Sequence, residues 1–256
     1  GMDEEGDIDM KMFQKKEHSQ AESLQREAQR AMKSQQHLRK VVESCRRCTE
    51  SRTFQRNAIL SQGENALLRV KLDPDALVEG HLEIVPVSHV VSILQCDEET
   101  QREIERFQSC LRRMYDKQGQ GVLFLETAVH FHSRPHAHID VIPIDRGMED
   151  EASMFFKEAF FSCDEEWAQH KKVIDLTSAR PLKRAVPGHF QYLSAEWGDP
   201  DCNSSVVASE SGSGSSMGPY GGIAHPVESE HTIDTNFCLD VVAGMLDLEP
   251  MRMRRS

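Results

Sequence analysis

The most informative segment of the chain reads HFHSRPHAHIDVIP over residues 130–143, and it holds four of the chain's 12 histidines. Side chains alternate between the two faces of a β-strand. A strand over residues 136–142 would turn His136, His138 and Asp140 to one face, and the small and branched residues between them to the other. We therefore expect one face of this strand to carry chemistry and the other to pack in the core.

The composition indicates a globular protein with some polar, unstructured segments. The chain has 256 residues, 38% hydrophobic and 28% charged, which is enough to bury a sizeable core. It has no run of about 18 apolar residues, so we expect no membrane span. Its acidic start lacks the pattern of a secretory signal, which favours the cytosol or the nucleus. Gly1-Met2 resembles an expression scar, so we expect the natural protein to extend upstream.

Cysteine count and net charge limit the classes of function. The seven cysteines are an odd number and lie mostly apart, so we expect reduced thiols rather than a disulfide framework. The formal net charge of −12 opposes non-specific binding to phosphate backbones over the whole surface. Local basic clusters remain, and the alternative for each is ordinary solvated surface. They are Arg112-Arg113, Lys171-Lys172, Arg180 with Lys183-Arg184, and Arg252, Arg254 and Arg255.

The first part of the chain combines a polar leader with a strand-rich region. Residues 1–40 are rich in Gln, Glu, Lys and Ala and should form an exposed helix or a disordered segment, with partner binding as an alternative. Residues 41–148 alternate short β-like runs with one helix over residues 97–118, which Asp97 would cap and Gly119 would end. We therefore expect an α+β fold, an antiparallel sheet crossed by one helix.

The remaining residues, 149–256, should form a second and smaller α+β unit. Apolar spacing predicts a helix over about residues 150–172, with Trp167 on its apolar face, and another near residues 237–248. Short β-like segments lie between them. Residues 203–222 are dominated by Ser and Gly and should form a mobile loop, because they are too poor in apolar side chains to order themselves.

Cys45 and Cys48 form a C-x-x-C unit just before the strand-rich region. In a reducing compartment such a pair can be a redox couple, two unremarkable thiols or half of a tetrahedral zinc site. The other half would require two neutral imidazoles, for which His89 and His136 are natural candidates. The residues alone leave these alternatives open.

Two stretches resemble the histidine-triad (HIT) superfamily. Residues 80–90 (GHLEIVPVSHV) are similar to its G-H-x-L-I-V-P-x-x-H strand, and residues 135–143 (PHAHIDVIP) to its H-x-H-x-H active-site strand. In zinc-bearing members the metal is held by a C-x-x-C pair, a His after the first strand and the first His of the triad. The resemblance therefore implies a structural Zn²⁺. By position its ligands are Cys45, Cys48, His89 and His136.

The C-terminal half extends the resemblance to a narrower family. Residues 155–160 (FFKEAF), 187–193 (PGHFQYL) and 220–225 (YGGIAH) look like the second conserved block of CwfJ-type C-terminal domains. With the earlier motifs, the resemblance covers roughly residues 40–250. The chain is thus identified as a member of this splicing-associated branch of the HIT superfamily. The expected architecture is a HIT-like sheet followed by a CwfJ-type unit.

The resemblance also implies roles around the triad. His138 resembles the nucleophile, whose neutral imidazole attacks phosphorus near pH 7. Ser133 matches a hydroxyl that hydrogen-bonds the phosphate, and His132 lies where relatives often carry Gln. Arg134 would add positive charge at a phosphate or RNA, although it can equally project into solvent. These four residues are the expected phosphate pocket.

Asp140 departs from the family pattern, because the third triad position is usually His or Gln. An ionised carboxylate cannot donate a hydrogen bond to phosphate and would repel it. Asp140 must therefore be neutralised or turned onto a cation, or the pocket no longer hydrolyses nucleotides. A carboxylate here could instead orient an imidazole or help to hold a metal.

Together these resemblances imply a nuclear, splicing-associated module on the late, intron-lariat spliceosome. It would be linked to lariat debranching or spliceosome disassembly by binding RNA, spliceosome components and a debranching enzyme. The alternative is an active phosphodiester or nucleotidyl hydrolase with His138 as nucleophile, so the sequence leaves enzymatic activity open. Asp140 favours the module, and the additional C-terminal half disfavours a stand-alone metabolic hydrolase.

Overall fold

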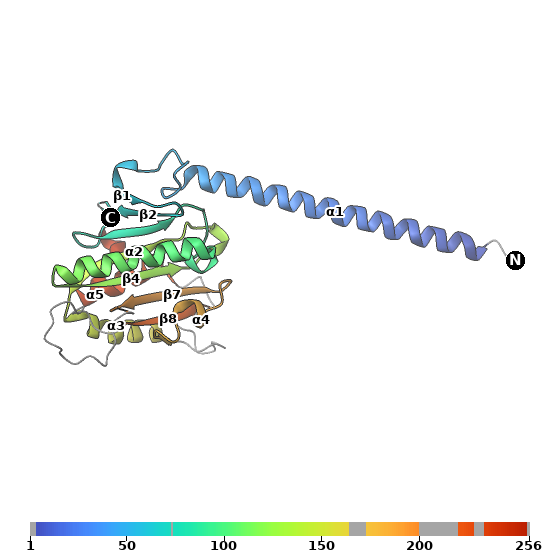
Figure 1. Ribbon diagram of the computed structural model, residues 1–256. Coiled ribbons are helices and arrows are strands. Elements are labelled where there is room, and N and C mark those ends of the chain that lie inside the picture. Colours follow the sequence, from blue (N-terminus) through green and yellow to red (C-terminus); the bar gives the residue numbers. More distant parts are fainter. Residues whose placement is uncertain (1–3, 73, 164–172, 200–219, 228–232, 255–256) are drawn as a thin grey trace.

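The structure, a computed structural model, describes residues 4–72, 74–163, 173–199, 220–227 and 233–254. Its centre is one eight-stranded antiparallel sheet in the order β1-β2-β3-β5-β4-β7-β8-β6 (Figure 1). The strands are β1 Ile59–Gln62, β2 Ala66–Val70, β3 Leu82–Pro86, β4 Gln120–Ala128, β5 Ile139–Asp145, β6 Ile174–Leu176, β7 Gln191–Trp197 and β8 Gly221–Val227. The expected α+β fold with an antiparallel sheet is confirmed.

Six α-helices accompany the sheet in the described segments. They are α1 Glu4–Ser44, α2 Glu98–Lys117, α3 Met148–Ser162, α4 Leu182–Ala185, α5 Phe237–Met245 and α6 Met251–Arg254. The polar leader forms α1, which projects away from the sheet as one long rod (Figure 1). No helix in the described part of the chain is long and apolar enough to cross a bilayer.

α2 crosses one face of the sheet and is capped as predicted. The Asp97 side chain accepts a hydrogen bond from the Thr100 N–H at 2.8 Å, which satisfies one free donor of the first turn. Gly119, with φ of +76°, lets the chain turn back into β4. The apolar side of α2 packs on one face of the sheet. The buried cluster there includes Ala66, Leu68, Leu82, Ile84, Ile104, Leu111, Phe124, Ile139 and Val141.

α3 and α5 cover the opposite face of the sheet. Phe156 and Phe160 of α3 and Leu239 of α5 are buried in one cluster with Leu125 of β4 and Ile142 of β5. Removal of such apolar surface from water contributes about 25 cal/mol per Å², which makes it the main force between the layers. Phe156 and Phe160 of α3 thus pack against strands of the N-terminal part.

The two parts of the chain that the sequence analysis separates after residue 148 build one continuous sheet. β1 to β5 come from the first part, and β6 to β8 from the second. β4 joins them, because its Leu125 pairs with Asp140 of β5 on one side and with Ala195 of β7 on the other. The second part therefore extends the sheet of the first by three strands.

The His-rich segment enters the sheet later than predicted. The sequence predicts a strand over residues 136–142, whereas β5 begins at Ile139. His130 and Arg134 adopt left-handed φ values of +57° and +52°, and the 3₁₀ turn between them keeps the chain out of the sheet. The expected alternation nevertheless begins before the strand, because Ala137 is buried in the core beneath α2.

Two further expectations lie partly outside the described residues. The helix predicted over residues 150–172 corresponds to α3 as far as Ser162, and Trp167 falls in a stretch that is not described. Most of the Ser- and Gly-rich loop predicted over residues 203–222 also lies outside. Its last two residues belong instead to β8, which begins at Gly221.

Candidate functional site

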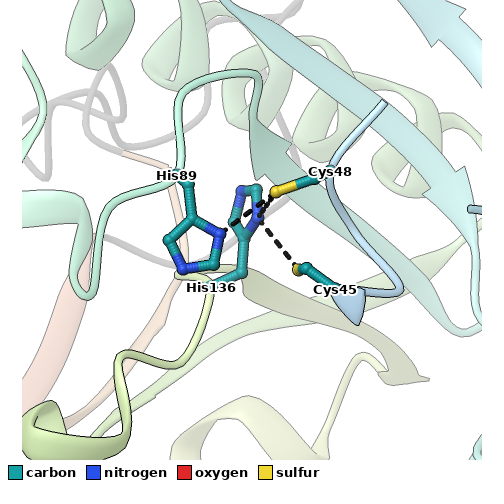
Figure 2. Close-up of side chains that lie close together, drawn as sticks. All are labelled: Cys45, Cys48, His89 and His136. Atoms are coloured by element: carbon teal, nitrogen blue, oxygen red, sulfur yellow. Dashed lines mark hydrogen bonds between the residues drawn. The ribbon is translucent and has the colours of Figure 1, made fainter. Parts of the chain in front are cut away.

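Two cysteines and two histidines from distant segments meet beside the start of β5. Cys45 and Cys48 follow α1, His89 follows β3, and His136 precedes β5 (Figure 2). Cys48 Sγ lies 3.1 Å from His89 Nδ1 and 3.3 Å from His136 Nδ1, and Cys45 Sγ lies 3.4 Å from His136 Nδ1. We call these four residues the thiol–imidazole cluster. The structure thus brings together all four predicted metal ligands.

Backbone carbonyls fix the orientation of both imidazole rings in this cluster. His89 Nε2 lies 3.0 Å from the Arg134 carbonyl oxygen, and His136 Nε2 lies 2.8 Å from the Pro86 carbonyl oxygen. A carbonyl can only accept a hydrogen bond, so both Nε2 atoms must carry the proton. Both Nδ1 lone pairs then face the sulfur atoms, which is the arrangement of metal-binding histidines.

The dimensions of the thiol–imidazole cluster fit a tetrahedral metal ion. Metal bonds of about 2.0 Å to nitrogen and about 2.3 Å to sulfur require N···S separations of about 3.6 Å. The three N···S separations of 3.1, 3.3 and 3.4 Å are close to this value. The hydrogen bond with Cys48 lowers the pKa of Cys45, with help from His136 and His89 and against burial. This favours a thiolate, the form that binds metals.

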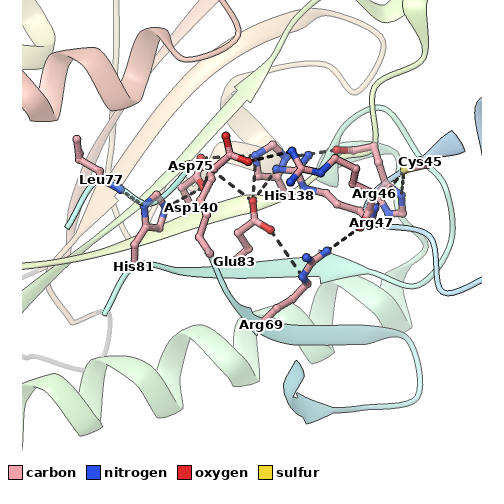
Figure 3. Close-up of polar contacts among 12 residues, drawn as sticks. Cys45, Arg46, Arg47, Arg69, Asp75, Leu77, His81, Glu83, His138 and Asp140 are labelled. Carbon is pink, nitrogen blue, oxygen red and sulfur yellow. Dashed lines mark hydrogen bonds and ion pairs between the residues drawn. The ribbon is translucent and has the colours of Figure 1, made fainter. Parts of the chain in front are cut away.

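A row of charged residues crosses three neighbouring strands next to this cluster. Arg69 of β2 lies opposite Glu83 of β3, and Glu83 lies opposite Asp140 of β5. Residues opposite one another share a face of the sheet, and all three are buried. A cavity of 280 Å³ opens beside them. We define the charged pocket as this cavity with six of the ionisable residues that line it, Arg47, Arg69, Lys71, Glu83, His138 and Asp140. Figure 3 labels all of them except Lys71.

Asp140 is turned onto a cationic neighbour. Its Oδ1 lies 2.7 Å from Lys71 Nζ and 3.0 Å from His81 Nε2. His81 Nδ1 accepts the Leu77 N–H, so His81 Nε2 carries the proton and donates to Asp140. Burial opposes ionisation, but Lys71 and His138 outweigh it and hold the pKa of Asp140 well below its usual range. The structure therefore realises one of the alternatives for Asp140, pairing with a cation.

His138 lies between two carboxylates. Its Nε2 is 3.5 Å from Asp140 Oδ2 and 4.0 Å from Glu83 Oε1. Burial and the nearby Arg47 lower the pKa of His138, which favours the neutral ring. Burial also opposes ionisation of Glu83, but Arg47, which donates to Glu83 at 2.6 Å, and His138 lower its pKa to about 2. The pocket thus presents one imidazole among fixed charges.

The other residues of the expected phosphate pocket lie in the 3₁₀ turn or just after it. Ser133 Oγ donates to the His130 carbonyl oxygen at 2.8 Å, and His132 and Ser133 are exposed. Arg134 donates to Ser34 Oγ of α1 at 2.7 Å. None of these three residues is among the described residues that line the cavity. The structure does not bring them together with His138, and their roles at a phosphate stay predictions.

Most residues of the charged pocket are not among the site residues predicted from the sequence. Arg69 and Glu83 had a usable signal, because each places a charge inside an otherwise apolar strand. Such a charge is rarely buried without a partner. Lys71 and Arg47 had no comparable signal, because neither lies inside an apolar strand. Lys71 follows β2 and Arg47 lies between α1 and β1, so only the fold shows that they reach the pocket. His81 also has no role in the predicted site, and it holds Asp140.

The chain is similar to a family of known proteins over nearly its whole length. The family model described as "Protein similar to CwfJ C-terminal" matches residues 32–157, and "Protein similar to CwfJ C-terminus 2" matches residues 166–256. CWF19-like protein 2 of Danio rerio is 33% identical over 90% of this chain and 22% of its own length. The Caenorhabditis elegans CWF19-like protein 2 homolog is 28% identical over 99% of this chain and 50% of its own length.

A third relative has a name that states a role in the cell. Pre-mRNA-splicing factor cwf19 of Schizosaccharomyces pombe is 33% identical over 53% of this chain and 21% of its own length. The chain therefore spans between a fifth and a half of the length of these three relatives. Both family models match in order, on either side of the end of α3. The chain belongs to the family of proteins with CwfJ-type C-terminal domains.

Proposed function

We propose that this chain is a splicing-associated module that works in the nucleus, on the late, intron-lariat spliceosome. The observation that carries the proposal is the match to both CwfJ models, together with the name of the S. pombe relative, a pre-mRNA-splicing factor. The module would bind RNA, spliceosome components and a lariat-debranching enzyme. Through these contacts it would link splicing to lariat debranching or spliceosome disassembly.

The charged pocket supports binding more than catalysis. The Asp140 carboxylate is committed to Lys71 and His81, so it does not replace the third imidazole of a triad. The carboxylates of Asp140 and Glu83 also lie within 4.0 Å of His138. Fixed negative charge beside the attacking group would oppose the charge that develops on a transferring phosphoryl group.

The thiol–imidazole cluster is proposed to hold a structural Zn²⁺. Two thiolates and two imidazoles form a closed set of four ligands, which leaves no open position for a substrate. The ion would join the end of α1, the loop after β3 and the start of β5. Elemental analysis of the purified chain should find one zinc per molecule, and far less in the Cys45→Ser variant. Sub-stoichiometric zinc after careful preparation would count against the site.

A pull-down from nuclear extract tests the splicing role. The tagged chain should capture late-spliceosome proteins, a debranching enzyme and excised intron RNA, as identified by mass spectrometry and sequencing. RNase treatment of half of the extract separates direct protein contacts from contacts through RNA. The matched control is the same chain unfolded by metal removal and alkylation. Capture of nucleotide-metabolism proteins in place of splicing components would contradict the proposal.

A second candidate is an active phosphodiester or nucleotidyl hydrolase, because His138 lines the cavity beside Arg47 and Lys71. In that reaction a ring nitrogen would attack phosphorus, the leaving group would depart with its bonding electrons, and water would then cleave the new P–N bond. The test is incubation with capped, adenylylated and branched oligonucleotides, followed by intact-mass analysis. A His138 adduct that is absent in His138→Asn would support hydrolysis. Without an adduct or a His138-dependent product, this candidate fails.

A further inference from the structure

The two arginines between the cysteine ligands face the charged pocket. They occupy the middle of Cys45-Arg46-Arg47-Cys48, and both line its cavity. Arg47 Nη2 donates to Glu83 Oε1 at 2.6 Å, and Arg46 Nη1 donates to Asp75 Oδ2 at 2.9 Å. One short loop therefore supplies sulfur ligands to the thiol–imidazole cluster and cations to the charged pocket (Figures 2 and 3).

The same loop is tied to β2 and to its own cysteine. Arg69 Nη1 donates to the Arg46 carbonyl oxygen at 3.1 Å. The Arg47 N–H donates to Cys45 Sγ at 3.4 Å. The path of the backbone between the cysteines thus depends on where the two sulfur atoms are held. A metal bound by Cys45 and Cys48 would fix both ends of the Arg46-Arg47 dipeptide.

Two of the pocket's guanidinium groups keep an unused donor. The Nε–H groups of Arg47 and Arg69 are buried and have no hydrogen-bond acceptor within the described part of the chain. Glu83 Oε2 is 3.9 Å from Arg69 Nε, which is too long for a hydrogen bond. Arg69 is only 5% exposed, but it lines the cavity, so a ligand in the cavity would lie next to its guanidinium. A buried donor without a partner is costly, so an acceptor that enters the cavity beside these two groups would be favoured.

We propose that Arg47, Arg69 and Lys71 hold a phosphate group of RNA beside His138, and that metal binding sets the affinity by fixing Arg46 and Arg47. Phosphate oxygens only accept hydrogen bonds and match the planar fork of a guanidinium. Carboxylates occupy some of the pocket's donors, but the two Nε–H groups remain for the ligand. The choice of RNA rests on the function proposed above. The residues and the control by the metal go beyond it.

A binding assay on the whole chain tests the residues. The probe is a short, 3′-labelled oligouridylate with a 5′-phosphate, and the 5′-hydroxyl form and free inorganic phosphate separate an RNA phosphate from phosphate alone. Arg47→Gln and Arg69→Gln should each weaken binding of the 5′-phosphate form about tenfold, because each removes a charged donor. Arg47→Lys should recover part of the loss. Arg113→Gln, an exposed arginine of α2, should change nothing.

The role of the metal is tested by measuring how bound phosphate changes the release of zinc. If the metal strengthens phosphate binding, bound phosphate must hold the metal more tightly by the same factor. Saturating 5′-phosphate oligouridylate should therefore slow zinc transfer to a chromogenic chelator severalfold in the wild-type chain, and should not slow it in Arg47→Gln. This measurement starts from the folded, metal-loaded protein, so it remains valid if the metal-free chain unfolds.

The outcomes separate this inference from the proposed function. RNA binding that is insensitive to Arg47→Gln, or zinc transfer that is equal with and without the oligonucleotide, overturns the inference while the splicing role stands. Equal binding of the 5′-phosphate and 5′-hydroxyl forms, together with no loss of binding in Arg69→Gln, also overturns it. Phosphate-dependent protection of zinc that is lost in Arg47→Gln supports it, even if the pull-down finds no splicing component.

Discussion

The thiol–imidazole cluster and the charged pocket lie next to each other and are stabilised in opposite ways. In the cluster, ring nitrogens face sulfur atoms, and the other nitrogen of each ring is held by a carbonyl. In the pocket, full charges face each other, as in the 2.7 Å pair of Lys71 and Asp140. His136 and His138 are two residues apart, yet each belongs to a different site. The partners that the fold gives each ring, sulfur atoms for His136 and carboxylates for His138, therefore separate the chemistry of two neighbouring histidines.

The largest expected effect comes from removing a ligand of the thiol–imidazole cluster. Cys48→Ser should lower the free energy of unfolding on the order of 5 kcal/mol, because metal binding to the folded state contributes directly to stability. Urea denaturation of the zinc-loaded proteins measures this difference. Cys110→Ser is the matched control, since Cys110 is exposed on α2. Equal stability of the two variants would mean that metal binding at Cys48 does not stabilise the fold.

Breaking the main ion pair of the charged pocket should have the next largest effect. Lys71 and Asp140 side chains are both 10% exposed, so Lys71→Met leaves a buried carboxylate without its cation and should destabilise the fold by about 3 kcal/mol. Adding Asp140→Asn should recover part of this loss, and a double-mutant cycle by urea denaturation measures the coupling. Strictly additive effects would show that the interaction between Lys71 and Asp140 contributes nothing to the free energy of unfolding.

Glu126 is a third case, a buried carboxylate whose hydrogen-bond donors are neutral. The Ile93 N–H donates to it at 2.8 Å and the Tyr192 hydroxyl at 2.6 Å. Burial raises its pKa from 4.5 to about 7, although these two bonds oppose the rise. The unfolded chain therefore ionises first, and the stability that Glu126 contributes is full below pH 4.5 and is lost as the pH rises toward 7.

The stability of the wild type relative to Glu126→Gln should accordingly fall by about 2.5 kcal/mol between pH 5 and pH 8. Urea denaturation at several pH values measures this slope. A flat difference for Glu126→Gln would mean that Glu126 is ionised in the folded protein.

The smallest effect is expected for Arg134→Ala. The Arg134 side chain bonds Ser34 of α1 in an exposed position, so its loss should cost only about 0.5 kcal/mol. Its carbonyl oxygen, which holds His89, is kept in the variant. Zinc content measured by elemental analysis should therefore stay at the wild-type level. Loss of zinc would mean that the side chain, and not only the backbone, supports the thiol–imidazole cluster.

The elements around the site could be predicted where the signal is local. Apolar runs interrupted by Gly and Pro indicate β1 to β3, and the Asp97 cap with helical spacing indicates α2. The four metal ligands were predicted from the order of separate motifs in a known family, and the fold brings them together. Spacing alone left three interpretations of Cys45 and Cys48 open: a redox pair, inert thiols or half of a metal site. The family resemblance favoured the metal site.

The charged pocket could not be predicted in the same way. The row of Arg69, Glu83 and Asp140 exists only in the observed register of three strands, and a shift by one residue would turn each side chain to the other face. Left-handed backbone at His130 and Arg134 has no local signal either, because neither residue is a glycine. That turn keeps residues 130–134 out of the cavity lining.

β4 makes the two halves of the chain depend on each other. One of its edges is occupied by β5 and the other by β7, along a strand of nine mostly buried residues. A chain shortened after α3 would leave the β7 side of this strand as an open row of N–H and C=O groups, which is a template for aggregation. The regions matched by two separate family models are therefore expected to fold, and to be inherited, as one unit.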